Sequence, residues 1–92
     1  MRGNQFVLAV QTMALLALTP EEAHTSYEIA TQLGKHPAFL RRLTGKLVSA
    51  DLLLAHQGPG GGNVLALPAN AITLADVYSA VVRITLCKDE TT

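Results

Sequence analysis

In the first part of the chain, polar positions recur among apolar ones with the spacing of a helix. Between residues 4 and 18 the polar side chains are Asn4, Gln5, Gln11 and Thr12, two pairs separated by seven positions. They would form one narrow stripe on an otherwise apolar helix, and such a helix is buried on more than one side. We therefore predict a helix over residues 4–18, with one face toward the core and another toward a second copy of the chain.

The next segment has the pattern of two helices joined by a tight turn. Thr25 and Glu28 have capping-box spacing, in which a hydroxyl and a carboxylate satisfy the free amides at a helix start. Gly34 suits the left-handed residue that ends a helix, and Pro37 suits the first turn of the following one. We predict a helix of about two turns, a turn, and a second helix that begins at Pro37.

The second helix of this pair has two different faces. At about 100° per residue, Leu40, Leu43 and Leu47 share one face, which we expect in the core. The opposite face carries Ala38, Arg41, Arg42, Gly45 and Ser49, with Lys35 and Lys46 to one side. Seven basic residues balance seven acidic ones in the whole chain, but no Asp or Glu occurs between residues 29 and 50. This helix is therefore a local cationic surface that can approach a polyanion.

The last third of the chain predicts a hairpin and a final helix. Residues 52–57 and 63–67 read as strands, and the glycine-rich stretch 58–62 reads as the turn between them. Thr73 and Asp76 begin a last helix, with the acidic residue near its N-terminus. The resulting fold class is mainly α with a small β-hairpin. We predict a winged helix-turn-helix domain over residues 1–88 and a polar tail over residues 89–92.

Composition narrows the class of protein further. Apolar residues make up 49% of the chain and charged residues 15%, so its 92 residues can form one compact domain. The apolar run of residues 6–18 is shorter than the roughly 20 residues that span a bilayer, and no signal-peptide cleavage site follows it. A single cysteine, Cys87, excludes an internal disulfide. We expect a cytoplasmic protein without a membrane segment.

The chain offers no recognisable catalytic or metal-binding pattern. The glycine turn joins two strands and lacks the Lys-Ser/Thr of a phosphate-binding loop. The three histidines show no metal-ligand spacing, and no nucleophile, base and acid occur together. We therefore expect neither an enzyme nor a metal site. Cys87 is either a structural bystander or a redox switch, since thiol reactivity depends on its surroundings.

Several motifs in sequence order resemble a bacterial regulator family. They are Glu28-Ile29-Ala30, Pro37-x-x-Leu40-x-x-Leu43, Gly58-Pro59-Gly60-Gly61-Gly62, Leu65-Ala66-Leu67-Pro68 and Ile72-Thr73-Leu74-Ala75-Asp76-Val77. Together they closely resemble the signature of the Rrf2 family, from about Phe6 to Val82. That family includes an iron–sulphur cluster regulator, a nitric-oxide-sensing repressor and a cysteine-metabolism repressor. The resemblance implies a homodimeric transcriptional regulator, a repressor, that reads a palindromic site in double-stranded DNA.

The chain also departs from the family pattern. Gln57 stands where the family commonly has Arg, and Asn63 and Val64 stand where an aromatic residue and Arg are frequent. The wing has therefore lost cations, while Arg41 and Arg42 add them to the second helix. Iron–sulphur members use three closely spaced cysteines, and Cys87 alone cannot hold such a cluster. We expect no cofactor.

Two functions remain open from the sequence. The first is a DNA-binding transcriptional regulator, with Lys35, His36, Ala38, Arg41, Arg42 and Lys46 contacting DNA from the recognition helix and His56, Gln57, Gly58, Gly60, Gly61 and Asn63 from the wing. Arg41 and Arg42 would contact bases or phosphates, and the wing glycines would let backbone amides meet phosphates. The second is a winged-helix protein-interaction module that has lost DNA binding, which the neutral charge and the depleted wing favour.

Overall fold

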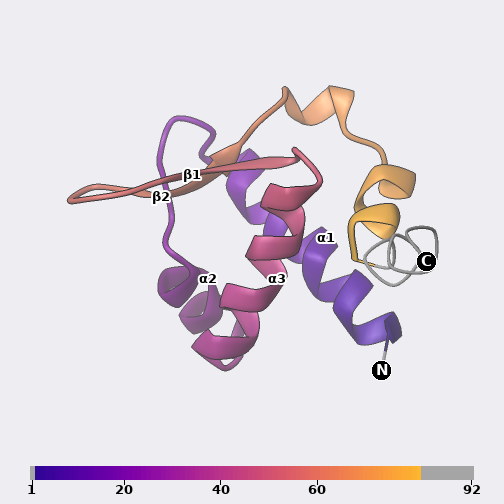
Figure 1. Ribbon diagram of the computed structural model, residues 1–92, viewed down its shortest axis with the longest axis horizontal. Coiled ribbons are helices and arrows are strands. Elements are labelled where there is room, and N and C mark those ends of the chain that lie inside the picture. Colours follow the sequence, from indigo (N-terminus) through magenta and orange to yellow (C-terminus); the bar gives the residue numbers. More distant parts are fainter. Residues whose placement is uncertain (1, 82–92) are drawn as a thin grey trace, which may run out of the picture.

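The computed structural model describes residues 2–81 (Figure 1). Three helices come first: α1 (Arg2–Leu18), α2 (Ser26–Leu33) and α3 (Pro37–Ser49). The strands β1 (Leu53–His56) and β2 (Gly62–Leu65) form the hairpin, and a 3-10 turn (Ala69–Ala71) leads to a last helix described over residues 74–81. This order confirms the predicted winged helix-turn-helix fold. Cys87 and the polar tail predicted at 89–92 lie outside the described residues.

The observed boundaries differ from the predicted ones at a few places. Helix α1 begins at Arg2, two residues before the prediction. Both strands are shorter than predicted, because the antiparallel pairing runs only from Leu53 opposite Leu65 to His56 opposite Gly62. The 3-10 turn after Pro68 was not predicted; its closing hydrogen bond runs from the Ala71 amide to the Pro68 carbonyl at 2.8 Å.

Local signals at the helix ends act as the sequence predicts. The Thr25 hydroxyl accepts from the Glu28 amide at 3.0 Å, and the Glu28 carboxylate accepts from the Thr25 amide at 3.0 Å. Gly34 ends α2 in the left-handed conformation, with φ of 68°. Pro37 is the first residue of α3. These caps fix the length of α2 and the turn that aims α3.

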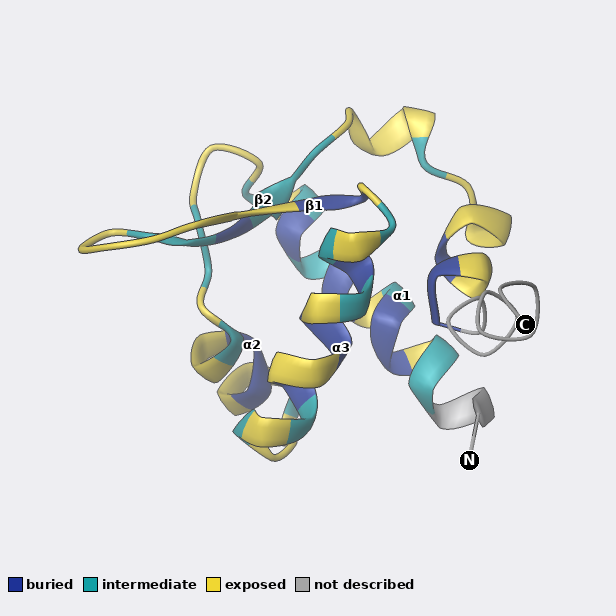
Figure 2. Ribbon diagram, viewed as in Figure 1, coloured by how far each residue is buried: buried dark blue, intermediate teal, exposed yellow. Residues whose placement is uncertain are grey.

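The core lies where α1, α3 and β1 meet (Figure 2). The predicted leucine face of α3 is fully buried, and its members pack with Leu16 of α1 and Ile29 of α2. The polar stripe predicted on α1 is only partly correct. Gln11 is exposed, but Thr12 is completely buried. Burial is tolerated because the Thr12 hydroxyl donates a hydrogen bond to the Leu8 carbonyl of the same helix at 2.9 Å.

The hairpin is tied to the helix-turn-helix by a contact that the sequence did not predict. His24, in the loop before α2, pairs with Asn63 of β2 as an isolated antiparallel bridge. The Asn63 amide donates to the His24 carbonyl at 2.7 Å, and the His24 amide donates to the Asn63 carbonyl at 3.1 Å. Gly62 permits this approach: its φ is 142°, and a Cβ there would lie 2.6 Å from the His24 carbonyl carbon. The loop therefore holds the hairpin near the turn end of its strand pairing, where Ala55 lies opposite Asn63.

Candidate nucleic-acid interface

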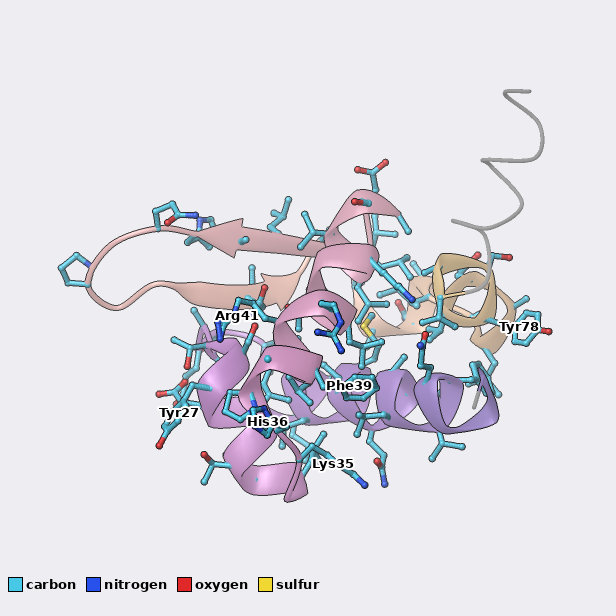
Figure 3. The ribbon with its side chains drawn as sticks, turned by 60° about the horizontal axis from the view of Figure 1, so that its bottom comes forward. Tyr27, Lys35, His36, Phe39, Arg41 and Tyr78 are labelled. Atoms are coloured by element: carbon cyan, nitrogen blue, oxygen red, sulfur yellow. The ribbon has the colours of Figure 1, made fainter. Side chains whose placement is uncertain are left out.

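An open groove of about 510 Å³ runs between α3, the start of α2 and the hairpin. We call it the wing-side groove. It is lined from the helices by Thr25, Ser26, Arg41, Thr44, Gly45 and Val48, and from the hairpin by Ala55, His56, Gln57, Gly58, Gly61, Gly62 and Asn63. Figure 3 shows Arg41 at the edge of α3 nearest the hairpin, with Phe39 and Lys35 toward α1. The fold thus brings Arg41 together with the predicted wing residues.

The start of α3 is held by its own sequence. His36 is the N-cap, and its Nδ1 accepts from the Ala38 amide at 3.4 Å, a long hydrogen bond. Pro37 follows with a backbone angle suited to the first turn. Both His36 and Ala38 are exposed. His36, which the sequence predicts as a DNA contact, thus also caps α3.

A polar contact fixes α2 against α3. The hydroxyls of Ser26 and Thr44 lie 2.9 Å apart, and Thr44 also donates to the Arg41 carbonyl at 3.1 Å. Thr44 is 4% exposed, so this contact is shielded from water. Thr25 and Ser26 were not among the predicted site residues, although the capping box marks them as a helix start. Only the packing of α2 on α3 places them in the groove.

The predicted cations of α3 divide between two flanks. Arg41 lines the wing-side groove. On the other flank the Arg42 guanidinium carbon lies 5.9 Å from the centre of the Phe39 ring, and the Lys46 ammonium donates to the Gln5 side chain at 3.0 Å. Lys35 lines a second hollow with residues of α1. One cationic face in the sequence is therefore two separate surfaces in the structure.

The tip of the wing is formed almost entirely by backbone. His56, Gln57, Gly58 and Gly60 are exposed, and both glycines have positive φ, 90° and 74°. Gly61 differs, because its amide donates to the Gly58 carbonyl at 2.9 Å and closes the turn. A Cβ on Gly61 would also collide with the His56 carbonyl oxygen. Gly61 therefore shapes the tip, and its amide is occupied.

Asn63 lines the same groove, but its hydrogen-bonding groups are engaged within the protein. It is 7% exposed, and its side-chain amide donates to the His24 carbonyl at 3.1 Å. The His24 ring is held in turn, since its Nε2 lies 2.8 Å from the Thr19 hydroxyl. The sequence predicts Asn63 as a DNA contact at the start of a strand. No pattern of neighbouring residues indicates the loop that covers it in the structure.

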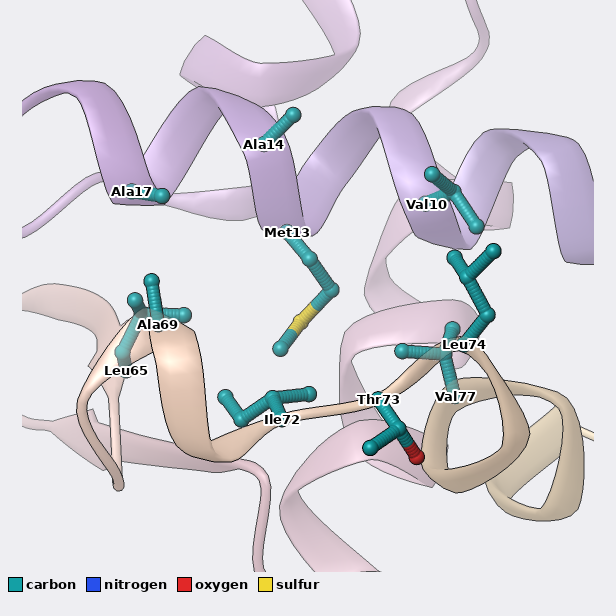
Figure 4. Close-up of a pocket in the computed structure, with 10 residues that line it drawn as sticks. All are labelled: Val10, Met13, Ala14, Ala17, Leu65, Ala69, Ile72, Thr73, Leu74 and Val77. Carbon is teal, nitrogen blue, oxygen red and sulfur yellow. The ribbon is translucent and has the colours of Figure 1, made fainter.

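A smaller hollow lies on another side of the molecule, between α1 and residues 65–77 (Figure 4). Its volume is about 210 Å³ and its lining is apolar except for Thr73. The Thr73 hydroxyl accepts from the Asp76 amide at 3.0 Å, so it serves as a helix cap. Leu74, which borders the hollow, is 63% exposed. We call this surface the apolar hollow; its lining offers packing but no charged group.

A recognition helix backed by buried leucines, a capped helix in front of it and a glycine-tipped hairpin beside it define a winged helix-turn-helix DNA-binding domain. The chain belongs to the Rrf2 family, described as "Iron-dependent Transcriptional regulator", whose sequence pattern matches residues 3–92. This is a family of transcriptional regulators rather than of enzymes.

Individual relatives agree with this assignment. The HTH-type transcriptional regulator YwgB of Bacillus subtilis is 40% identical over 74 residues, which are 79% of this chain and 47% of YwgB. IscR of Cereibacter sphaeroides is 31% identical over 80 residues, 87% of this chain and 52% of IscR. The chain therefore spans about half the length of the curated relatives it matches.

Solved structures show the same fold. CymR, the global cysteine regulator of B. subtilis, superposes with a TM-score of 0.75 at 23% identity, over 89% of this chain and 62% of CymR. IscR of T. potens gives a TM-score of 0.77 at 23% identity, over 95% of this chain and 72% of that protein. At these identities the likeness shows the fold alone.

The family description names iron, and iron in proteins needs several His, Cys, Asp or Glu donors close together. In the part of the chain that the structure describes, no group of three or more His, Cys, Asp or Glu side chains could hold a metal ion. The full sequence contains one cysteine, whereas a cluster needs several thiolates. These residues do not fit an iron–sulphur cluster.

No helix among residues 2–81 has the length and apolar character needed to cross a bilayer.

Proposed function

We propose that the chain binds double-stranded DNA as a homodimer and represses transcription by occupying a palindromic operator. Helix α3 enters the major groove, and the wing lies along the adjacent backbone or minor groove. The observation that carries this proposal is the wing-side groove, which joins Arg41, the start of α2 and the glycine tip into one concave surface. Repression is the simpler mode, because occupancy alone can block transcription, whereas activation needs a further contact.

The exposed ridge of α3 has the shape that close approach to base edges requires. Ala38, Gly45 and Ser49 are short and exposed along it. Nothing lies within 4 Å of the position that a Cβ on Gly45 would take, so this part of the helix is open to a ligand. Arg41 stands among these short side chains, and an Arg can contact the O6 and N7 atoms of guanine together. We assign sequence reading to Arg41.

The proposed contact set follows from the positions described above. It contains Lys35, His36, Ala38, Arg41, Arg42 and Lys46 from the helix, His56, Gln57, Gly58 and Gly60 from the wing, and Thr25 and Ser26 at the start of α2. Asn63 and Gly61 shape the surface without presenting their amides. Backbone amides at a helix start suit a phosphate.

The homodimer rests on a different surface. Leu18 and Leu74 are 78% and 63% exposed, and the apolar hollow lies beside Leu74. Exposed apolar surface of this kind marks contact sites on small domains. A dimer with two-fold symmetry presents two recognition helices, and its site is a palindrome for the same reason. We propose that it acts in the cytoplasm, and that these residues hold no cofactor of their own.

The test is a titration of duplex DNA with two proteins. A preferred duplex is first selected from fragmented genomic DNA, and its affinity is compared with that of a random duplex at 50 and 200 mM salt. The wild-type protein should prefer the selected duplex, and Arg41→Gln should lose about tenfold or more of that preference, the value of one good base contact. Glu21→Gln, an exposed change in the loop before α2, serves as the control.

One observation favours a second function. The hairpin, from Leu53 to Leu65, contains no Lys or Arg, and the chain has no net charge. A wing without cations suits contact with a protein. Failure of the wild-type chain to bind any duplex at 50 mM salt would favour this interaction module and reject the DNA-binding proposal.

A further inference from the structure

We infer that α3 carries a separate phosphate clamp on the flank that faces α1, formed by Lys35, Arg42 and Lys46, with Gln5 and Phe39 as its positioning residues. This inference rests on the proposed DNA binding and adds to it. The clamp would hold the phosphodiester backbone on the side of the major groove away from the wing. Arg41 would then read bases, while this α1 flank supplies affinity without sequence preference.

The two sides of α3 are physically distinct. A hollow between α1 and α3 is lined by Gln5, Phe39, Arg42, Leu43 and Lys46, and its neighbour is lined by Gln5, Lys35 and Phe39 among others. Neither hollow contains Arg41 or a wing residue. Gln5 and Phe39 border both hollows, so one amide and one aromatic ring are shared between Lys35 on one side and Arg42 and Lys46 on the other.

Both positioning contacts restrict a flexible cation. The Arg42 guanidinium lies over the half-buried Phe39 ring at 5.9 Å, within the range of a cation–π contact. The Lys46 ammonium donates to the Gln5 oxygen at 3.0 Å, and this bond joins α3 to α1 across 41 positions of sequence. A long side chain that is already ordered loses less entropy when it binds. Gln5 and Phe39 therefore prepare the cations for a ligand.

No carboxylate among residues 5–81 forms an ion pair with the cations of this flank. The one ion pair in the described part of the chain joins His24 and Glu28, so none of the three cations lies within 4.0 Å of a carboxylate there. The sequence agrees, because no acidic residue occurs between Glu28 and Asp51. Two ordered cations, Arg42 and Lys46, together with the exposed Lys35, favour an anion with several charges in a row, which is the chemistry of a nucleic-acid backbone.

The position of the flank favours phosphates over bases. The major groove is about 12 Å wide and is bordered by two phosphate backbones, so a helix inside it has one backbone on each side. The short residues of the ridge face the bases, and the wing-side groove meets the first backbone. The α1 flank then meets the second. Lysine acts as a point charge without the planar fork that reads guanine, which suits this role.

The test measures the salt dependence of binding to a random duplex, which needs no operator. A plot of log affinity against log salt has a slope set by the number of phosphate contacts, about 0.9 per contact. Arg42→Gln and Lys46→Met should each lower this slope by about one, and affinity at low salt should fall for both variants. Their ratio of selected to random duplex affinity should stay within twofold of the wild type, unlike that of Arg41→Gln.

The positioning role of Gln5 is tested by a double-mutant cycle. Gln5→Met, which keeps length and removes the acceptor, should weaken binding to the random duplex about two- to fivefold when Lys46 is present. In the Lys46→Met background the same change should have no effect, because its only route to DNA is gone. Gln32→Met, an exposed glutamine on α2, is the matched control and should leave binding unchanged.

The outcomes separate this inference from the proposed function. Wild-type slope in both cation variants, with sequence preference still dependent on Arg41, would overturn the clamp and leave the regulator standing. An equal effect of Gln5→Met with and without Lys46 would overturn the positioning role. Thermal unfolding of each variant accompanies the titrations, and a variant that unfolds early is replaced by Arg42→Met or Lys46→Gln, which also remove the charge.

Discussion

Asn63 and His24 hold each other through three hydrogen bonds. Their backbones exchange amide-to-carbonyl bonds of 2.7 and 3.1 Å, and the Asn63 side chain adds a third bond of 3.1 Å to the same His24 carbonyl. The two residues are 39 positions apart. Their pairing joins the loop before α2 to β2 as an isolated bridge, near the turn end of the hairpin. The angle between the wing and α3 therefore depends on a residue that belongs to neither.

Replacing Asn63 by Ala should destabilise the fold. The change removes a buried donor and leaves the His24 carbonyl with one bond fewer, a loss of about 1–2 kcal/mol of unfolding free energy. Urea denaturation measures it. Gln57→Ala, on the exposed part of the wing, is the control and should change stability by less than about 0.5 kcal/mol. Equal stability of Asn63→Ala and the wild type would show that the side-chain bond adds nothing to the two backbone bonds of the bridge.

Two glycines should respond to the same substitution in opposite directions. Gly62→Ala places a methyl group 2.6 Å from the His24 backbone at a positive φ, so the bridge must open and the melting temperature should fall. Gly45→Ala meets nothing within 4 Å and gains about 1 kcal/mol of helix propensity, so the melting temperature should rise. Scanning calorimetry of both variants measures the difference. A lower melting temperature for Gly45→Ala would contradict its open position.

Helix α3 ends in a conformation that its sequence does not favour. Asp51 follows the helix with φ of 65°, the left-handed region in which glycine carries no penalty. Asp51→Gly should therefore raise the unfolding free energy by up to about 1 kcal/mol, and Asp51→Ala should lower it. Urea titrations of the two variants report the sign directly. Two changes of the same sign would mean that the aspartate side chain, rather than the backbone angle, decides stability here.

The capping box of α2 predicts another matched pair. Thr25→Ala removes the acceptor for the Glu28 amide and should cost about 1 kcal/mol of unfolding free energy. Thr31→Ala, at an exposed position inside the same helix, removes only a bond back to the Tyr27 carbonyl and should be neutral or stabilising. Thermal unfolding by circular dichroism compares them. Equal losses in both variants would argue against a specific role for the cap.

The proposed dimer predicts that Leu74 and Leu54 behave differently. Both leucines are exposed, at 63% and 50%, but only Leu74 borders the apolar hollow. Leu74→Glu should shift the sedimentation coefficient from that of a dimer to that of a monomer at micromolar concentration, because it would bury a charge in the contact. Leu54→Glu, on the hairpin, should remain dimeric. A dimer that survives Leu74→Glu would place the contact elsewhere.

The parts of the fold that follow from neighbouring residues could be predicted from the sequence. The Thr25 and Glu28 cap, the left-handed Gly34 and the leucine face of α3 are local patterns, and each is present as expected. Contacts between distant segments could not be predicted. Asn63 was placed on an exposed strand because the His24 loop that covers it carries no pairing signal.

The candidate site shows the same division. Helical spacing correctly put Arg41 and Arg42 on the outer face of α3, where both are exposed. Helical spacing could not predict that the two arginines lie on different flanks of α3. Their placement depends on the position of the wing on one side and of Gln5 of α1 on the other. Thr12 shows the limit for a single side chain: a polar residue type predicted exposure, but a bond to its own helix allowed complete burial.

The glycine tip of the wing has a consequence for the kind of DNA sequence that the protein would favour. A proline ring is the only side chain in the turn from Gly58 to Gly61, so the tip carries almost nothing that could distinguish one base edge from another. A loop that presents mainly backbone instead responds to the width and bendability of the DNA it meets. Narrow A-tract grooves and easily kinked pyrimidine–purine steps differ in these properties. The wing would thus contribute indirect readout of DNA shape, while α3 beside it contributes direct readout of base edges.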